Sequence, residues 1–331
     1  MRRCHDPILR SFSEDDYPAL AELLTLVYPD NPVSAEDLSY EDESRGKVCR
    51  FARWLAVLDG DGGGDGGGDG GGRVIGEAAY GQDADMYHPR KFWLKINVHP
   101  DFEGGEIEGL LFDKLMTALA PYQPLSLLTN IREDYALERA FYSARGFEQV
   151  MKHIEQRLVV ASFNSAGYQD ALERVTRGGI VIKSYAELES DPERDRKLWR
   201  LRNELDQQVP FAEPVTPVSF EWFEENILNH PNILLGGLLV AVRKNDYVGM
   251  TALLAGARDR QLNTDLTGVR GDARRQGVAL ALKLRAIEYA KIHNYTAIHT
   301  WVAESNRSML VINKKLGFGV RPAWLEYVKR L

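Results

Sequence analysis

Apolar positions along the chain predict a repeated order of strands and helices. In the C-terminal half we expect strands at 179–184, 233–242, 247–254, 262–269, 297–302 and 324–328, and helices at 192–206, 219–229, 276–292 and 306–316. The helix at 276–292 is predicted from apolar residues at helical spacing, among them Val278, Leu282 and Ile287. Asp191 and Ser219 are the expected N-caps of the two helices that precede it.

A glycine-rich run occupies residues 60–72, which read GDGGGDGGGDGGG. It has nothing to bury and is expected to form a flexible loop. Its flanks, 50–58 and 73–80, both have strand-like patterns, so the run is expected at the tip of a hairpin within a domain. The Asp-Gly spacing suits calcium, but no Glu follows where an EF-hand loop requires a bidentate ligand.

The two halves of the chain repeat the same pattern. The dipeptide Gly146-Phe147 recurs 171 residues later as Gly317-Phe318, and the same offset pairs Val98 with Val269. Each half reads strand, acid-containing turn, amphipathic helix, strand, second helix and strand, which indicates a tandem duplication. A chain of 331 residues is also long enough for two domains. We expect an N-terminal domain over 1–160, a connecting segment over 161–178 and a C-terminal domain over 179–331.

Composition and charge exclude several classes of protein. Hydrophobic residues make up 44% and charged residues 27%, which is typical of globular chains. The net charge of −7 argues against a nucleic-acid partner. The sequence predicts neither a membrane span nor a signal peptide, so a cytoplasmic location is expected. The two cysteines, Cys4 and Cys49, are too few for a disulfide framework, and the seven histidines lack metal-ligand spacing, so no metal is expected.

The richest candidate chemistry lies in 264–279, which reads TDLTGVRGDARRQGVA. A strand is expected to end at Val269, a turn carries Arg270, Arg274 and Arg275, and a helix follows. A helix start offers unpaired N–H donors and the positive end of the helix dipole, so this turn suits a phosphate. The alternative is a solvated basic turn before a surface helix.

Two motifs in this half resemble a known superfamily. Arg274-x-x-Gly277-x-Ala279 resembles the acetyl-CoA signature of the GCN5-related N-acetyltransferases (GNAT), although Gly271 stands where proline is common. Residues 300–318, TWVAESNRSMLVINKKLGF, resemble the superfamily's fifth strand and the helix after it. The layout is similar to that of mycothiol synthases and related bacterial tandem acetyltransferases. The resemblance implies an α/β (mixed α+β) fold of two GNAT-like domains, each with a central mixed, mostly antiparallel sheet flanked by helices, the first domain being degenerate.

The resemblance also implies how the C-terminal domain would bind acetyl-CoA. The main chain of Thr267, Gly268 and Val269 would pair with the pantetheine arm, and an amide near Val269 would stabilise the thioester oxygen. The backbone at the helix start would hold the pyrophosphate, through Arg274, Arg275, Gln276, Gly277, Val278, Ala279 and Leu280. Asn306 matches a residue that contacts the CoA arm, and it is equally suited to cap the helix at 306–316.

Acetyl transfer needs a neutral amine, whereas a lysine-like amine has a pKa of about 10.4. A carboxylate that removes the proton is the usual remedy, and Asp265 is the first candidate and Glu304 the second. The alternative for Asp265 is an ion pair with a nearby arginine. Many superfamily members place a Tyr where this chain has Asn313, to protonate the leaving thiolate. Asn313 or a water would have to donate instead, and the equivalent position in the first half is Tyr142.

The first half carries acids where the second carries its phosphate-turn residues. Glu103 stands at the position of Arg274, and Glu106 at the position of Gly277. Carboxylates favour a helix start but repel a pyrophosphate. We therefore expect the N-terminal domain not to bind acetyl-CoA in the usual way, and to supply structure and part of an acceptor cleft.

These patterns predict an acyltransferase that moves an acetyl group from acetyl-CoA to the primary amine of a small molecule by direct attack. Phe211 and Glu213, in the connection at 207–217, are candidates to line the acceptor cleft and attract a cationic amine; the alternative is an ordinary proline-rigidified loop. Other functions left open are a non-catalytic acyl-CoA-binding or regulatory protein and a protein N-acetyltransferase. The expected partner is the amine alone, and the chain is expected to be a monomer or a homodimer.

Overall fold

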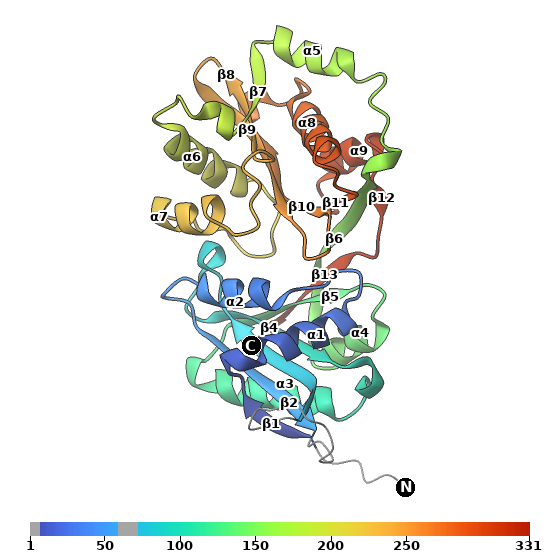
Figure 1. Cartoon of the computed structure of the whole chain (residues 1–331). Helices are drawn as coiled ribbons and strands as arrows, with labels where there is room; N and C mark the ends of the chain where they lie inside the picture. The colour runs from blue at the N-terminus through green and yellow to red at the C-terminus, as the bar shows by residue number, and fades with distance from the viewer. Residues whose placement is uncertain (1–6, 59–71) are drawn as a thin grey trace. The chain divides into compact units, whose positions relative to one another are not determined.

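The computed structural model describes residues 7–58 and 72–331, which divide into two compact units (Figure 1). Unit 1 takes the chain up to Val150 together with Leu325–Leu331, and unit 2 takes Met151–Trp324. These boundaries differ from the halves expected from the sequence, because residues 151–160 belong to unit 2 and the C-terminal residues belong to unit 1. Each unit therefore contains a strand from the other half of the sequence.

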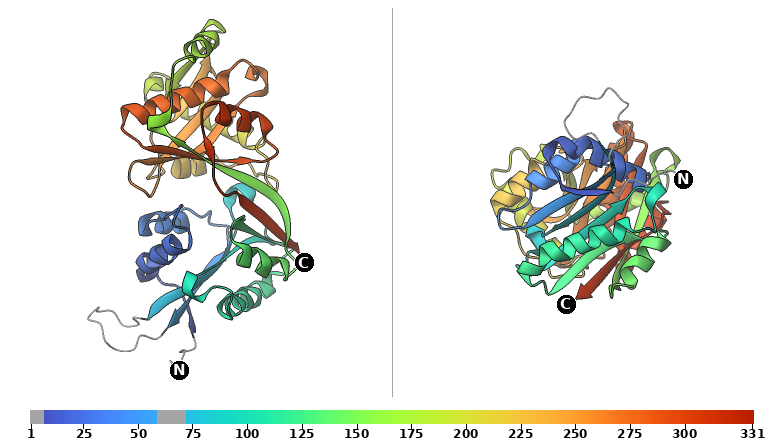
Figure 2. Two further views of the ribbon diagram at one scale, coloured as in Figure 1. Left: turned by 90° about the vertical axis from the view of Figure 1, so that its right-hand side faces the viewer. Right: turned by 90° about the horizontal axis from the view of Figure 1, so that it is seen from below.

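Unit 1 has a sheet in the order β1-β2-β3-β4-β5-β13. Its elements are β1 (Ile8–Ser11), α1 (Tyr17–Val27), α2 (Ala35–Glu43), β2 (Phe51–Leu58), β3 (Arg73–Gly81), β4 (Lys91–Val98), α3 (Ile107–Leu119), β5 (Ser126–Arg132), α4 (Ala136–Ser143) and β13 (Trp324–Arg330). Strands β1 to β4 pair antiparallel, and β4 pairs parallel with β5. Helices α1 and α2 cover one face of the sheet and α3 and α4 the other, with β13 beside β5 (Figure 2).

Side-chain alternation along β2 explains the two layers of unit 1. Leu55 and Val57 pack in a core with Leu20 of α1, whereas Ala56 between them packs in the opposite core with Leu111 of α3. The strands β2 and β3 pair from Leu58 and Arg73 onward, as expected for the flanks of the glycine-rich run. Residues 60–71 of the predicted loop lie outside the described part of the chain.

Unit 2 has a sheet in the order β6-β11-β10-β9-β8-β7, and β12 also pairs with β6. Its elements are β6 (Glu148–Val159), α5 (Gln169–Arg177), β7 (Ile180–Ser184), α6 (Arg194–Asp206), α7 (Phe220–Phe223), β8 (Leu239–Arg243), β9 (Asp246–Ala255), β10 (Gln261–Val269), α8 (Val278–Ile292), β11 (Ala297–Ala303), α9 (Arg307–Lys315) and β12 (Gly319–Val320). Only β10 and β11 pair parallel, so the predicted mixed, mostly antiparallel sheets are confirmed. Helices α6 and α7 lie on one face and α8 and α9 on the other (Figure 1).

Two expectations for the strands and helices of unit 2 need correction. The strand expected at 233–242 is shorter, because the paired strand starts at Leu239 and Ile233 forms only an isolated bridge. The interruption contains Gly236, where a Cβ atom would lie 2.8 Å from the Tyr289 ring. Helix α6 starts after Glu193 rather than after Asp191, although the Asp191 carboxylate accepts hydrogen bonds from the Glu193 amide at 3.0 Å and from Lys197 Nζ at 2.7 Å.

The segment at 161–178, expected to be a connection, carries α5 and packs into the core of unit 2. Val175 of α5 is buried in the same cluster as Val278 and Leu282 of α8. The segment is therefore part of the support of α8.

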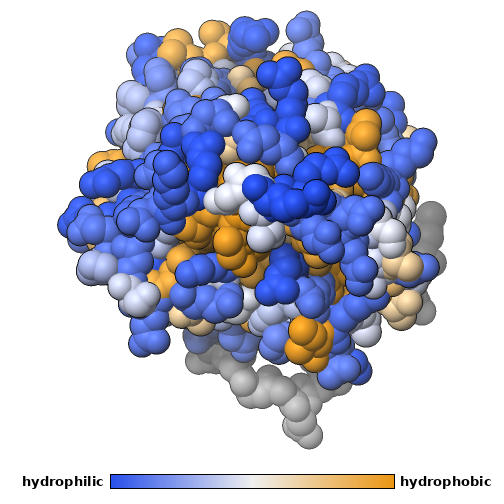
Figure 3. All heavy atoms as spheres, turned by 90° about the horizontal axis from the view of Figure 1, so that it is seen from above, coloured by the Kyte–Doolittle hydropathy of each residue, from blue (hydrophilic) through white to orange (hydrophobic). Residues whose placement is uncertain are grey.

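On the face shown in Figure 3, hydrophilic side chains predominate, with apolar side chains in smaller patches between them. Over residues 7–58 and 72–331, no helix has the length and apolar character needed to cross a membrane.

Candidate functional site

In each unit the parallel pair of strands separates after three residue pairs. Strand β10 pairs with β11 only at 261–263 and 297–299, and β4 pairs with β5 only at 91–93 and 126–128. Beyond Asn263, β10 continues without pairing to β11, so one edge of its main chain faces the opening between the strands. An opened edge of this kind can accept an extended ligand as an added strand.

The part of β10 predicted to bind a cofactor contains a bulge. Its register against β9 shifts between Thr264 and Thr267, so one extra residue is inserted there. Bulges re-aim side chains and are common beside active sites. At Gly268 a Cβ atom would lie 2.8 Å from Leu205 Cδ1 of α6, so the close approach of that helix requires a glycine.

The turn after β10 presents backbone amides at the start of α8. Arg275 and Gly277 have left-handed φ values of 61° and 85°. Gly277 is the N-cap and has no side chain with which to bond the first amides of the helix. The amides of Val278, Ala279 and Leu280 thus lie at the positive end of a 15-residue helix without a side-chain cap. This arrangement suits a phosphate group.

Arg274 holds this turn in place. Its Nε donates to the Val269 carbonyl oxygen at 3.0 Å, and its guanidinium donates to the Gln208 side chain just after α6. The side chains of Arg275 and Gln276 are exposed. The predicted residues from β10 to the start of α8 are therefore brought together as one continuous edge and turn, with Arg274 as a brace within it.

The structure shows the ion-pair alternative for Asp265. Its carboxylate pairs with the Arg202 guanidinium of α6, which also binds Asp206 at 2.7 Å. Burial raises the pKa of Asp206, although the Arg202 charge opposes that shift. Glu304, the second predicted base, is exposed directly after β11.

The two predicted asparagines have structural roles. Asn313 is completely buried, and its Nδ2 donates to Gln156 Oε1 at 2.8 Å. A proton donor must reach the leaving thiolate, so this placement in the core does not support the predicted role of Asn313. Asn306 caps α9, because its side chain accepts a hydrogen bond from the Met309 amide at 3.3 Å.

The candidate acceptor residues follow α6 in the chain. Phe211 is 38% exposed and Glu213 is half-buried, both in an irregular segment. That segment starts beside the turn that precedes α8, since the Gln208 side chain accepts a hydrogen bond from Arg274. It is also tied back on itself, because Gln207 Nε2 donates to the Val215 carbonyl oxygen at 3.2 Å.

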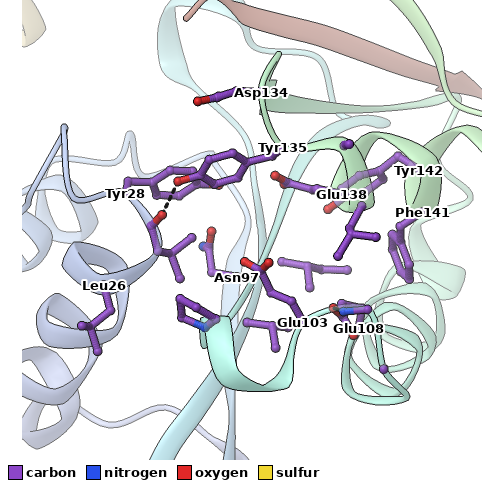
Figure 4. Close-up of a pocket in the computed structure, with 18 of the residues that line it drawn as sticks. Leu26, Tyr28, Asn97, Glu103, Glu108, Asp134, Tyr135, Glu138, Phe141 and Tyr142 are labelled. Atoms are coloured by element: carbon purple, nitrogen blue, oxygen red, sulfur yellow. Dashed lines mark hydrogen bonds between the residues drawn. The ribbon is translucent and has the colours of Figure 1, made fainter.

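A cavity that the sequence did not predict lies in unit 1 (Figure 4). It has a volume of about 720 Å³ and lies between the end of α1, the end of β4, the turn before α3 and the start of α4. The rings of Tyr28 and Tyr135 are stacked with centroids 5.5 Å apart, and the Tyr135 hydroxyl donates to the Val27 carbonyl oxygen. Two further lining residues are Glu138 and Tyr142 of α4.

Burial changes the acid–base properties of this cavity. It raises the pKa of Glu138 to about 8, with a further contribution from the Glu103 carboxylate. The pKa of Glu103 is itself raised by burial and by Glu108. The sequence analysis missed Glu138, Tyr28 and Tyr135 as site residues. The available signal was Tyr142, which is the unit 1 equivalent of Asn313, the position where the superfamily commonly has a tyrosine.

The turn before α3 differs from its counterpart in unit 2. Gly104 has a left-handed φ of 73°, like Arg275 at the equivalent position, but Glu106 has φ −79° where Gly277 is left-handed. Glu108 Oε1 accepts a hydrogen bond from the Gly104 amide at 2.7 Å. One amide donor of this turn is therefore already hydrogen-bonded to a carboxylate of the chain, and this arrangement opposes phosphate binding.

No set of three or more His, Cys, Asp and Glu side chains is arranged to hold a metal ion in the parts of the chain that the structure covers, 7–58 and 72–331.

Two units with this strand order, each with a parallel pair that opens beside a helix start, define a tandem arrangement of GNAT-like domains. The structure is similar over 98% of the chain to a tandem GNAT protein from the clavulanic acid biosynthesis pathway, with 17% identity, a TM-score of 0.72 and 98% of that chain covered. A GCN5-related N-acetyltransferase from Sphaerobacter thermophilus is similar at 17% identity and a TM-score of 0.68, with 98% of this chain and 95% of that chain covered. A putative acetyltransferase from Pyrococcus horikoshii has 12% identity and a TM-score of 0.56, with coverage of 98% and 90%.

The chain therefore has the tandem GNAT fold. No family model and no curated protein sequence matches it. At these identities the likeness to solved structures establishes the fold, and the activity has to be argued from the residues.

Proposed function

We propose that the chain is an acetyl-CoA-dependent N-acetyltransferase, in which unit 2 binds the cofactor and the acceptor is the primary amine of a small molecule. The observation that carries the proposal is the start of α8. There the N-cap is a left-handed glycine without a side chain, directly after a β10 edge that has separated from β11. The edge suits the pantetheine arm, and the helix amides suit the pyrophosphate.

In the proposed reaction, the neutral amine attacks the thioester carbonyl, a C–N bond forms and the C–S bond breaks. The proton lost from the amine passes to a base and the sulfur leaves as thiolate. Asp265 lies on the bulged part of β10, and its pairing with Arg202 fixes the position of the carboxylate that would accept the proton directly or through water. A thiolate departs with little help, because a free thiol has a pKa of about 8.5.

The second candidate function is a non-catalytic acyl-CoA-binding protein. It is favoured by one observation, the burial of Asn313 where the superfamily commonly has its tyrosine acid. Both functions require acetyl-CoA binding at the start of α8, and they differ in turnover.

Calorimetry with acetyl-CoA and a free-thiol assay with a panel of primary amines test the two functions together. We expect micromolar binding, amine-dependent thiol release, and at least tenfold slower release in Asp265→Asn. Asp259→Asn is the matched control, because Asp259 is an exposed acid in the turn between β9 and β10. Binding without turnover of any amine would favour the non-catalytic function, and no binding would refute both.

A further inference from the structure

Three carboxyl groups that line the cavity of unit 1 have no ion pair with a cationic side chain of the described residues. Three carboxylates line it, those of Glu103, Glu108 and Glu138, and the described lining includes no Lys, Arg or His. A fourth lining acid, Asp134, is already paired with Arg132 at 2.9 Å. Figure 4 shows Glu103 from the turn before α3 and Glu138 from α4, with both carboxylates pointing into the cavity.

Two buried polar atoms in the lining lack hydrogen-bond partners in the described structure. The first is the hydroxyl of Tyr142, a residue only 1% exposed, and the second is Glu108 Oε2. The Thr129 side chain and the Ile96 backbone lie beside the hydroxyl and favour its ionised form, against the effect of burial, but neither meets the distance and angle of a hydrogen bond to it. Buried polar atoms are nearly always satisfied, so unsatisfied ones around a cavity indicate a ligand that supplies hydrogen bonds. Both Glu108 Oε2 and the hydroxyl can accept from an N–H donor.

The walls of the cavity indicate the remainder of the ligand. Its volume of about 720 Å³ lies in the range of small-molecule sites, about 300–1,000 Å³. Leu26, Leu137 and Phe141 supply apolar surface, and the stacked Tyr28 and Tyr135 add aromatic surface. The Arg132 guanidinium already lies over the Tyr135 ring, 5.3 Å from its centroid, so the carboxylates rather than this ring would hold a cation. The carboxylates do not form a group suited to a metal ion within the described residues, and the apolar walls favour a cation with an organic body.

We propose that the unit 1 cavity binds an organic ammonium ion with an apolar body, its ammonium group held between Glu103 and Glu138. The site concerns unit 1 alone and does not depend on acetyl transfer by unit 2. It also gives a function to the acids that make the turn before α3 unsuited to pyrophosphate.

Binding of an ammonium ion should release a proton. With a pKa of about 8, the Glu138 carboxyl is mostly neutral at pH 7, and a bound cation favours its carboxylate form. Glu103 faces it from the turn before α3, and the hydroxyls of Tyr28, Tyr135 and Tyr142 are further titratable groups that interact with it. The proton leaves to solvent as the ammonium–carboxylate pair forms, so the charges balance.

The experiment is calorimetry of the full chain, without acetyl-CoA, with hexylammonium as the probe and hexan-1-ol and hexanoate as uncharged and anionic counterparts. We expect saturable binding of hexylammonium, at least tenfold tighter than of either counterpart. At pH 7 the heat should vary between phosphate and Tris buffers, because the two buffers take up the released proton with different enthalpies.

Glu138→Gln and Glu103→Gln keep the side-chain shapes and should each weaken hexylammonium binding at least tenfold. Glu138→Gln should also abolish the buffer dependence. The matched control is Glu106→Gln, which changes an acid of the same turn that does not line the cavity and should bind like the parent. Thermal melts check that each variant folds, and Tyr142→Phe provides a second variant that keeps the carboxylates.

Three results would overturn the proposal. They are equal binding of hexylammonium and hexan-1-ol, unchanged binding in both Glu138→Gln and Glu103→Gln, and an equal loss in Glu106→Gln. The second of these would place the amine elsewhere in the chain, for example at the acceptor site of unit 2.

Discussion

Substitution of Gly277 tests the proposed cofactor site most directly, because backbone strain and charge can be separated at this position. Gly277 has φ 85°, a conformation that costs most L-residues about 1–2 kcal/mol. Space does not restrict it, since an added Cβ would lie 3.5 Å from Val175 Cγ2, an ordinary contact. Gly277→Ala should therefore fold with modestly reduced stability, and Gly277→Asn should lose less, because Asn tolerates left-handed φ.

Gly277→Glu adds a carboxylate to the same strain. Two unit charges about 5 Å apart repel by about 3 kcal/mol at an effective dielectric near 20, which is about a hundredfold in affinity. The new carboxylate can also cap the helix amides, as Glu108 takes the Gly104 amide in unit 1. We expect Gly277→Glu to bind acetyl-CoA at least a hundredfold more weakly than Gly277→Ala.

Isothermal titration calorimetry with acetyl-CoA measures the three affinities, and circular dichroism melts measure the three stabilities. If Gly277→Glu bound as tightly as the parent, the pyrophosphate would not lie at this turn and the proposed function would lose its support. If Gly277→Ala lost as much affinity as Gly277→Glu, the backbone conformation would be decisive and the charge argument would fail.

Three further predictions concern stability. Lys283 is 3% exposed and burial lowers its pKa to about 8. Lys283→Met should therefore stabilise the chain by about 3 kcal/mol at pH 7, and should remove the rise in stability that the parent shows between pH 8 and 10.5. Urea titrations measure both effects, and the absence of both would contradict the argument. Gly268→Ala should cost about 1–3 kcal/mol through its clash with Leu205, with the loss partly recovered in a double variant with Leu205→Ala; additive losses would show that the two residues do not interact. The Arg10 hydrogen bonds lower the pKa of Asp16 to about 2. As the pH falls from about 4 through 2, the free energy of unfolding of the parent should therefore decrease by about 1 kcal/mol more than that of Asp16→Asn. An equal decrease in the two proteins would refute the pairing.

The sequence predicted the elements of unit 2 well because most of them carry local signals. The helix at 276–292 appears as Val278–Ile292, and Ser219 caps its helix as expected. Both features depend on neighbours within a few residues, as periodicity and caps do. The strand expected at 233–242 was wrong in its first part, where the packing of Gly236 against Tyr289 decides the backbone path.

The exchange of strands between the units could not be predicted from local pattern. The strand at 148–159 and the strand at 324–330 both have strand-like sequences, and the pattern assigns each to its own half. Their partners are chosen by long-range pairing, such as that of Leu158 with Ile298 of β11. A repeat offset compares sequences and carries no information about which sheet accepts a strand.

The same difference between local and long-range information explains which of the candidate sites was predicted. The turn at 270–277 was found because its chemistry is contiguous in sequence. The unit 1 cavity was missed because Tyr28, Glu103 and Glu138 come from three separate elements. In addition, the partner of Asp265 is Arg202, 63 residues away, so the sequence left its role open between base and ion pair.

The two repeats place opposite chemistry at equivalent positions. Arg274 in unit 2 corresponds to Glu103 in unit 1, and the left-handed Gly277 corresponds to Glu106. A turn cannot serve a pyrophosphate and an ammonium ion at once, because each requires the charge that repels the other. Duplication removes this conflict, since one copy can keep the anion site while the other acquires acids. The two proposals therefore support each other on physical grounds while resting on different residues and separate experiments.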